Sequence, residues 1–301
     1  CTTVFVDDLT EELDDANLHS LVHGVIRLEQ TVAIYGPERR RLRVFKMRGR
    51  DFRGGSHDYV IRTGGIEVFP RLVAAEHNPG FEDNEPAASG IAELDHLLGG
   101  GLDRGTSTLI MGPAGSGKSS LAMQYMTQRL DRGESALFIS FDETRRNFFR
   151  RASGLGMDFA AHGDRFHFLQ VDPAELSPGE LVNVIRHHVE CRSVSVVALD
   201  SLSGYQNAMP EEQFLLLQMH ELLTYLNQQG VMTILVLAQH GLVAFAPGVG
   251  TDRAPHGGKP FQVGSNSFRI ECDVDHVPRF ERCIGHARQN AAEVGGRLLV
   301  L

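Results

Sequence analysis

The chain has 301 residues, a formal net charge of -9, and 42% hydrophobic and 22% charged residues. This length suits one large domain, or one domain with a piece of another, and the acidic balance argues against a general polyanion binder. The four cysteines show no disulfide-framework spacing, and no apolar run is long enough to span a bilayer. We therefore expect a cytoplasmic protein that does not bind membranes.

The first part of the chain, residues 1–73, is predicted to be rich in β-strands. We expect a short strand over 2–6, a hairpin with its turn at 35–38, and a second hairpin around Gly64-Gly65. Gly and Pro mark hairpin turns, and Gly-Gly tolerates the backbone conformation of tight ones. A few strands without a helix cannot cover both faces of a sheet. The segment is therefore interpreted as the end of a larger domain. The polar segment 74–88, with two prolines, predicts a linker.

Residues 89–243 alternate apolar strands with helices. The expected strands are STLIM, ALFISF, FHFLQV, VSVVALD and VMTILVLAQ. One helix has a clear start, with Ser177 as N-cap and Pro178 at its first position, and a long one is expected between Pro210 and Gly230. Near-continuous apolar strands between helices predict an α/β core with a mainly parallel sheet flanked by helices.

A glycine-rich loop stands between the first of these strands and the helix that follows. The segment GPAGSGKSS matches the phosphate loop of nucleotide-binding proteins and comprises Gly112, Pro113, Ala114, Gly115, Ser116, Gly117, Lys118, Ser119 and Ser120. Its glycines let backbone N–H groups turn toward phosphates, and the helix start adds its positive dipole end. Lys118 would supply a catalytic point charge to the β- and γ-phosphates, and the Ser119 hydroxyl would bind Mg²⁺.

Polar residues at three other strand ends are candidates for the same site. Asp200 ends a buried strand and either supplies the second Mg²⁺ contact or caps the next turn. Asp142 and Glu143 end another strand, where they either orient and deprotonate an attacking group or cap the following helix. Gln239 ends the fifth strand and either senses the γ-phosphate or simply begins a loop.

The run SGIAELDHLLGGGLDRGTSTLIMGPAGSGKSSLAMQYM, with LFISFDETRRNFFRRASGLGMDF and VVALDSLS, resembles the KaiC family of RecA-like P-loop ATPases over residues 89–243. The resemblance implies a RecA-like core that binds ATP and Mg²⁺ at the interfaces of a homo-oligomeric ring, commonly a hexamer. It also implies signalling partner proteins, and the circadian clock member is an ATPase and Ser/Thr autokinase. Asp142 and Glu143 fall where the family has a catalytic Glu pair, with Asp in place of the first Glu.

The resemblance extends to the ends of the chain in different ways. Residues 1–73 look like the C-terminal strands of a first KaiC domain, whose K-x-R strand motif reaches the ATP of a neighbouring subunit. Lys46 and Arg48 match that motif, which gives the basic run from Arg39 an alternative to nucleic-acid binding. The Gly/Pro-rich tail, residues 244–301, departs from the family pattern, so phosphorylation sites cannot be placed in it. Its weak strand signals include RLLVL, and its Cys and His spacing is too loose to predict zinc.

Three functions remain open on this core. The leading hypothesis is an ATP-binding ATPase with Ser/Thr autokinase activity in a regulatory ring. A RecA/RadA-like DNA-dependent ATPase would need basic or aromatic loops after the fourth and fifth strands, and SLSGYQNAMPEE has one Tyr and no cation. We therefore expect no nucleic-acid partner. A nucleotide-gated scaffold that does not hydrolyse ATP is the third reading.

Overall fold

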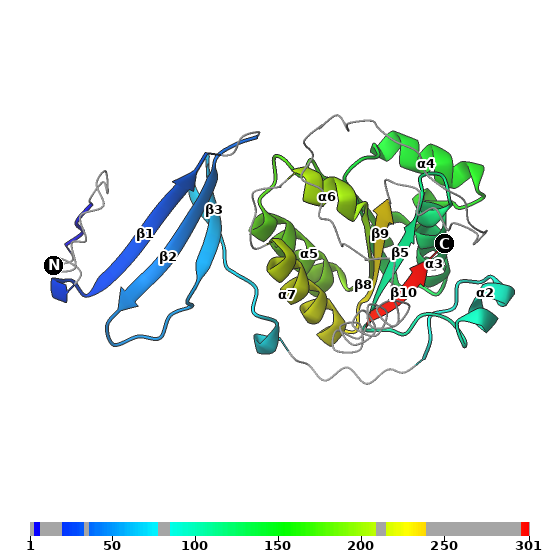
Figure 1. Cartoon of the computed structure of the whole chain (residues 1–301), viewed down its shortest axis with the longest axis horizontal. Helices are drawn as coiled ribbons and strands as arrows, with labels where there is room; N and C mark the ends of the chain where they lie inside the picture. Colours follow the sequence, from blue (N-terminus) through cyan, green and yellow to red (C-terminus); the bar gives the residue numbers. More distant parts are fainter. Residues whose placement is uncertain are drawn as a thin grey trace, which may run out of the picture.

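The computed structural model describes residues 3–6, 20–32, 36–77, 85–208 and 215–238, and the backbone of 296–300. Within these residues there are two sheets, one of four strands in the order β1-β2-β3-β4 and one of six in the order β10-β5-β9-β8-β6-β7. Figure 1 shows the first sheet, in blue, beside the second, which helices cover on both faces. The predicted α/β core with a preceding β-rich segment is confirmed.

The four-stranded sheet consists of two hairpins. β1 spans Gly24–Thr31 and β2 spans Arg39–Met47, and they pair antiparallel across the first turn. β3 spans Ser56–Arg62 and β4 spans Gly65–Phe69, and they pair across the Gly64 turn, where φ is +106°. The strand predicted over 2–6 is wrong for the described residues 3–6: they pair with no strand, and their apolar side chains are exposed. A β-rich composition forms a strand only where a neighbour completes the backbone hydrogen bonds.

The two faces of this sheet differ because side chains alternate along each strand. Leu28 and Ile26 of β1 lie opposite Leu42 and Val44 of β2, and the apolar row continues on β3 and β4. Several of these side chains are exposed: Ile26, Leu28, Ile61, Ile66 and Val68. The other face carries the polar side chains that contact the parallel core.

That polar face lies against the start of α5, which spans Pro178–Arg192. The Asp58 carboxylate, buried on β3, accepts a hydrogen bond from the Gly179 N–H at 2.8 Å. Arg62 pairs with Glu180 one residue further along the helix. Arg39 of β2 donates to the Ala174 carbonyl at 2.8 Å. Two charged side chains of the sheet thus hold it to the start of α5, and a third holds it to the segment before that helix.

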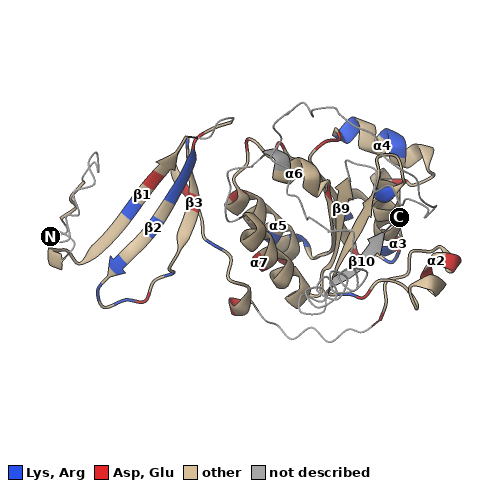
Figure 2. Cartoon of the chain, viewed as in Figure 1, with Lys and Arg blue, Asp and Glu red and all other residues tan. Residues whose placement is uncertain are grey.

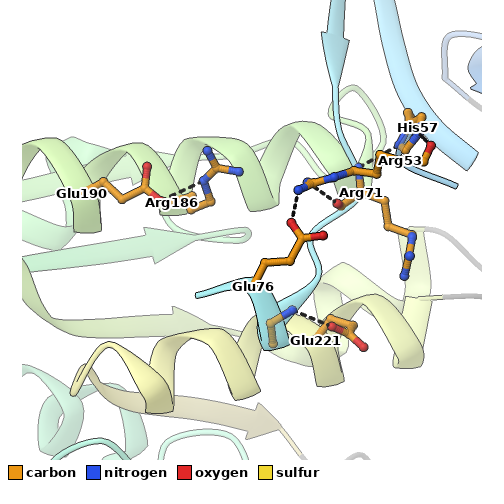
Figure 3. Close-up of polar contacts among 8 residues, drawn as sticks. Arg53, His57, Arg71, Glu76, Arg186, Glu190 and Glu221 are labelled. Atoms are coloured by element: carbon orange, nitrogen blue, oxygen red, sulfur yellow. Dashed lines mark hydrogen bonds and ion pairs between the residues drawn. The ribbon is translucent and has the colours of Figure 1, made fainter. Parts of the chain in front are cut away.

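The chain leaves β4 and packs between two helices of the core (Figure 3). Arg53 forms an ion pair with Glu76 in the short helix η1, Ala74–Glu76. The Ala74 N–H donates to Glu221 at 3.0 Å on α7, Leu215–Gln228. Leu72 and Ala74 are buried in the core beside α5 and α7. The first residues of the predicted linker 74–88 are therefore packed, and its residues 78–84 lie outside the described part.

The core elements follow the predicted alternation of strands and helices. The strands pair in parallel throughout: β5 Ser107–Gly112, β6 Ser135–Ser140, β7 Phe166–Gln170, β8 Val194–Asp200, β9 Met232–Ala238 and β10 Gly296–Val300. Helix α2, Ala92–Leu97, precedes β5. Besides α5 and α7, the helices between the strands are α3 Lys118–Asp131, α4 Arg145–Gly154, η2 Phe159–Arg165 and α6 Leu202–Ala208. Ser177 caps α5 by accepting from the Glu180 N–H, as expected from the sequence. In the part of the chain that the structure describes, no helix is long and apolar enough to cross a membrane.

Both faces of the parallel sheet are buried, which explains its continuous apolar strands. On β6, Phe138 packs with Phe148 and Phe168 on the side of α3 and α4. Its neighbours Leu137 and Ile139 pack on the opposite side, under α5 and α7. Layers on both faces fix the strand positions, and therefore the positions of the loops at the carboxyl ends of the strands.

Candidate functional site

A pocket of about 450 Å³ opens at the carboxyl ends of β5, β6 and β8. In a parallel α/β sheet, ligands bind in the crevice outside these strand ends. The lining residues come from the phosphate loop, the segment after β6, helix α4 and the end of β8: Gly115, Gly117, Lys118, Ser119, Ser120, Ser140, Asp142, Glu143, Asn147, Arg151 and Asp200.

The phosphate loop connects β5, which ends at Gly112, to α3, which begins at Lys118. Gly115 and Gly117 have φ of +81° and +90°, a backbone region that L side chains rarely adopt. The Lys118 side chain is 7% exposed, and its Nζ donates to the Pro113 carbonyl at 2.7 Å. The ammonium group thus lies inside its own loop, with the helix N-terminus beside it.

The two residues predicted to bind Mg²⁺ meet at the pocket floor. The Ser119 hydroxyl, in the first turn of α3, hydrogen-bonds to the carboxylate of Asp200 at the end of β8. Burial raises the pKa of Asp200, while the Ser119 hydrogen bond and the charge of Arg151 oppose that rise. A hydroxyl and a carboxylate in contact form an oxygen donor set of the kind that Mg²⁺ prefers.

The acid pair after β6 is held by two different partners. Asp142 accepts a hydrogen bond from the Ser201 hydroxyl at 2.9 Å. The Glu143 backbone N–H donates to the Ser140 hydroxyl at 2.9 Å. The N-cap of α4 is Thr144, so neither acid takes the capping role that the sequence left open. Both carboxylates line the pocket.

Arg151 is the main lining residue that sequence reasoning missed. Its Nε donates to Glu143 Oε1 at 3.2 Å and its Nη2 to Glu143 Oε2 at 2.6 Å, a bidentate pair. Figure 2 marks the basic residues of α4 in blue and, in red, the acidic residues of the segment that precedes it. Asn147 and Arg151 are four residues apart on α4 and so share a helix face, which is the signal that could have found them. Ser140 was also missed, because a strand-end Ser gives no comparable pattern.

The remaining predicted residues lie elsewhere. Lys46 and Arg48, at the end of β2, donate to the Ser20 carbonyl at 3.5 and 2.7 Å, and neither lines the pocket. Gln239 and the Cys and His residues of the tail lie outside the described residues. No group of three or more metal-binding side chains occurs within the described ranges.

Comparisons with known proteins agree with the fold and with the loop. The family model described as "ATPase: KaiC" matches residues 1–73 and 87–245. The circadian clock oscillator protein KaiC of Picosynechococcus sp. is 27% identical over 178 residues, which are 58% of this chain and 34% of that protein. The KaiC of Synechococcus elongatus is 26% identical over 179 residues, again 58% and 34%. That of Parathermosynechococcus lividus is 27% identical over 219 residues, 71% and 40%. The chain thus matches over about a third of the length of most of these relatives.

Proposed function

The chain belongs to the KaiC family of ATPases, and on that premise we propose that its pocket binds Mg-ATP and hydrolyses the terminal phosphate. One observation carries the proposal: Lys118, the Ser119–Asp200 pair and the acids Asp142 and Glu143 line a single pocket. Family membership implies nucleotide binding, and this set adds the groups that phosphoryl transfer needs.

The residues present fit ATP and Mg²⁺. The loop glycines leave backbone N–H groups clear to face phosphates, and Lys118 can exchange the Pro113 carbonyl for phosphate oxygens. Ser119 and Asp200 would hold Mg²⁺, which supplies charge neutralisation at the β- and γ-phosphates when it is bound. A metal ion would also favour the ionised form of Asp200, whose pKa is raised by burial.

The acids would then manage the proton of the attacking group. In this mechanism Asp142 or Glu143 orients a water molecule in line with the terminal phosphate and accepts its proton. The Ser201 hydroxyl fixes the Asp142 carboxylate, and in this structure Arg151 pairs with that of Glu143. Lys118 lines the same pocket and stabilises the negative charge on the transferred group.

The nature of the acceptor separates an ATPase from an autokinase. Water as acceptor gives free phosphate, and a Ser or Thr hydroxyl of the protein gives a phosphorylated chain. We propose ring assembly, with Lys46 and Arg48 directed to the ATP of a neighbouring subunit, in line with the expectation from the family. The autokinase reaction and the ring assembly both extend the proposal beyond the pocket itself.

Lys118→Ala tests the site directly. We expect this variant to lose ATP binding in calorimetry, since it removes the only lysine among the residues that line the described pocket. Arg132→Ala is the matched control, because Arg132 lies at the far end of the same helix and should leave binding unchanged. Tight ATP binding by Lys118→Ala would contradict the proposed site.

ATP labelled at the γ-phosphate then identifies the reaction. Free labelled phosphate supports hydrolysis, and labelled protein supports autokinase activity. Binding without either product would leave a nucleotide-gated scaffold as the better description, and turnover that needs DNA would favour a recombinase-like ATPase.

A further inference from the structure

At the pocket wall, the side chain of Arg151 is bound to both carboxylate oxygens of Glu143 through its Nε and Nη2. We propose that Arg151 binds the terminal phosphate of a bound nucleoside triphosphate, and that Glu143 is its partner only while that phosphate is absent. The proposal rests on the proposed function, because it concerns the same nucleotide pocket. It assigns the site a cation from its own chain, independent of any group that a neighbouring subunit supplies.

The geometry places the guanidinium where a phosphate would compete for it. Arg151 lines the pocket together with Lys118, Ser119 and Asp200. Its charge acts on Asp200 strongly enough to oppose the rise in that residue's pKa. The guanidinium group is therefore within electrostatic reach of the Mg²⁺-side carboxylate as well as bonded to Glu143.

The chemistry of the guanidinium favours the exchange. Arginine presents parallel N–H donors that match carboxylate and phosphate oxygens equally well in shape. A terminal phosphate carries more negative charge than a carboxylate, and Glu143 is partly exposed, with 24% of its side chain accessible. Water can therefore take over the carboxylate when Arg151 leaves it, which keeps the cost of the exchange low.

The rest of α4 restricts how far Arg151 can move. The guanidinium carbon lies 5.9 Å from the centroid of the Phe148 ring, and Phe148 is fully buried in the core. The side chain starts from a helix that packs firmly on the sheet, so a change of rotamer is sufficient to redirect it.

The exchange would make Glu143 available at the right moment. In this structure Arg151 holds both carboxylate oxygens of Glu143. A triphosphate that draws Arg151 away leaves this carboxylate without its cation, and a diphosphate does not. The site would thus have an unpaired base only when there is a terminal phosphate to transfer.

Affinities for two nucleotides test the inference. Calorimetry would compare wild type with Arg151→Ala and Arg151→Lys, using Mg²⁺ with either ADP or a non-hydrolysable ATP analogue. We expect Arg151→Ala to weaken analogue binding by about tenfold to a hundredfold, the range for a lost charge-assisted hydrogen bond, and ADP binding by less than about twofold. Arg151→Lys should fall between the two, since it keeps the charge and loses the fork.

Arg146→Ala serves as the control for charge. Arg146 is exposed on the same helix and does not line the pocket, so its loss should change neither affinity. Equal losses for ADP and the analogue in Arg151→Ala would overturn the inference, because Arg151 would then only support the pocket. Unchanged affinities would overturn it as well. If wild type binds neither nucleotide, the proposed function fails together with the inference, which is a distinct result.

Discussion

The partly buried carboxylate of Asp200 lowers the stability of the protein at a position that the proposed chemistry needs. Burial is the largest influence on this group and raises its pKa above the ordinary carboxyl value. The folded chain therefore binds that proton more tightly than the unfolded chain does. The free energy of unfolding consequently falls as pH rises from the ordinary value through the raised one.

Asp200→Asn should therefore stabilise the protein without ligands at pH 8. Asn can still accept from Ser119 and carries no charge to desolvate, so we expect the melting temperature to rise by about 2–4 °C. The gain should shrink as the pH is lowered through the raised pKa of Asp200, because the wild-type carboxyl group then becomes neutral as well. Thermal scans over this pH range, without nucleotide or Mg²⁺, make the measurement. A lower melting temperature at every pH would contradict the assignment of burial as the dominant cause.

At the same scale, the sequence identified those site residues that belong to a local pattern. The phosphate loop could be predicted because a strand, a glycine-rich turn and a helix follow one another in the chain, and Asp200 because it ends an apolar strand. The pairing of Glu143 with Arg151 could not, because arginine on a helix is usually a solvated residue. The role of Arg151 depends on the fold, which places α4 beside the pocket.

Elements of the core were predictable because each satisfies its own rules. Strands such as β6 and β8 are apolar without interruption, and α5 has its cap and its first-turn proline. β10 is different: its pairing with β5 adds residues 296–300 at one edge of the sheet, and RLLVL alone gave only a weak signal. Pairing between strands so distant in sequence depends on the assembled sheet.

The turn before β5 contains a glycine whose replacement should be costly. Ala87 and Leu102 form a backbone bridge, with N···O distances of 2.6 and 3.0 Å, and both are buried. Gly101 next to this bridge has φ of +135°, and a Cβ there would overlap the Ala87 carbonyl oxygen. The segment therefore accepts only glycine at this position.

Gly101→Ala should lower the free energy of unfolding by about 2 kcal/mol or more, from backbone strain and the clash together. Gly99→Ala is the control: its φ is +73° with no atom within 4 Å of the added Cβ, so it should cost only about 1 kcal/mol. Urea denaturation of both variants gives the comparison. Equal losses in the free energy of unfolding would show that the Ala87–Leu102 bridge shifts to accommodate the added methyl group.

For the whole molecule, the contact of the four-stranded sheet with the parallel core depends on few residues. Asp58 is 8% exposed, accepts from the Gly179 N–H and lies 3.6 Å from Arg41. The opposite face of the same sheet exposes its apolar row, as a sheet does when nothing covers that face. That residues 1–73 are the remnant of a first domain remains a prediction from the family resemblance.

Asp58→Ala should lower the free energy of unfolding by about 1–3 kcal/mol, because it leaves the partly buried Gly179 N–H at the start of α5 without this partner. Glu67→Ala is a suitable control, since the Arg62–Glu67 pair is about half exposed and should contribute less than about 1 kcal/mol. Denaturation, with hydrogen exchange at the first turn of α5, measures both. Similar results for the two variants would show that the sheet is held by other contacts.

The site is assembled from strands that emerge from the ribosome far apart in time. The phosphate loop follows β5, but the carboxylate that completes the Mg²⁺ pair ends β8, after two further strands have been made. A nascent chain that has reached α4 already displays the glycine loop and cannot yet bind Mg-ATP through Ser119 and Asp200. Because β9 lies between β5 and β8 in the sheet, nucleotide would bind through this pair only in chains translated past β9, and would act during synthesis as a ligand selective for assembled cores.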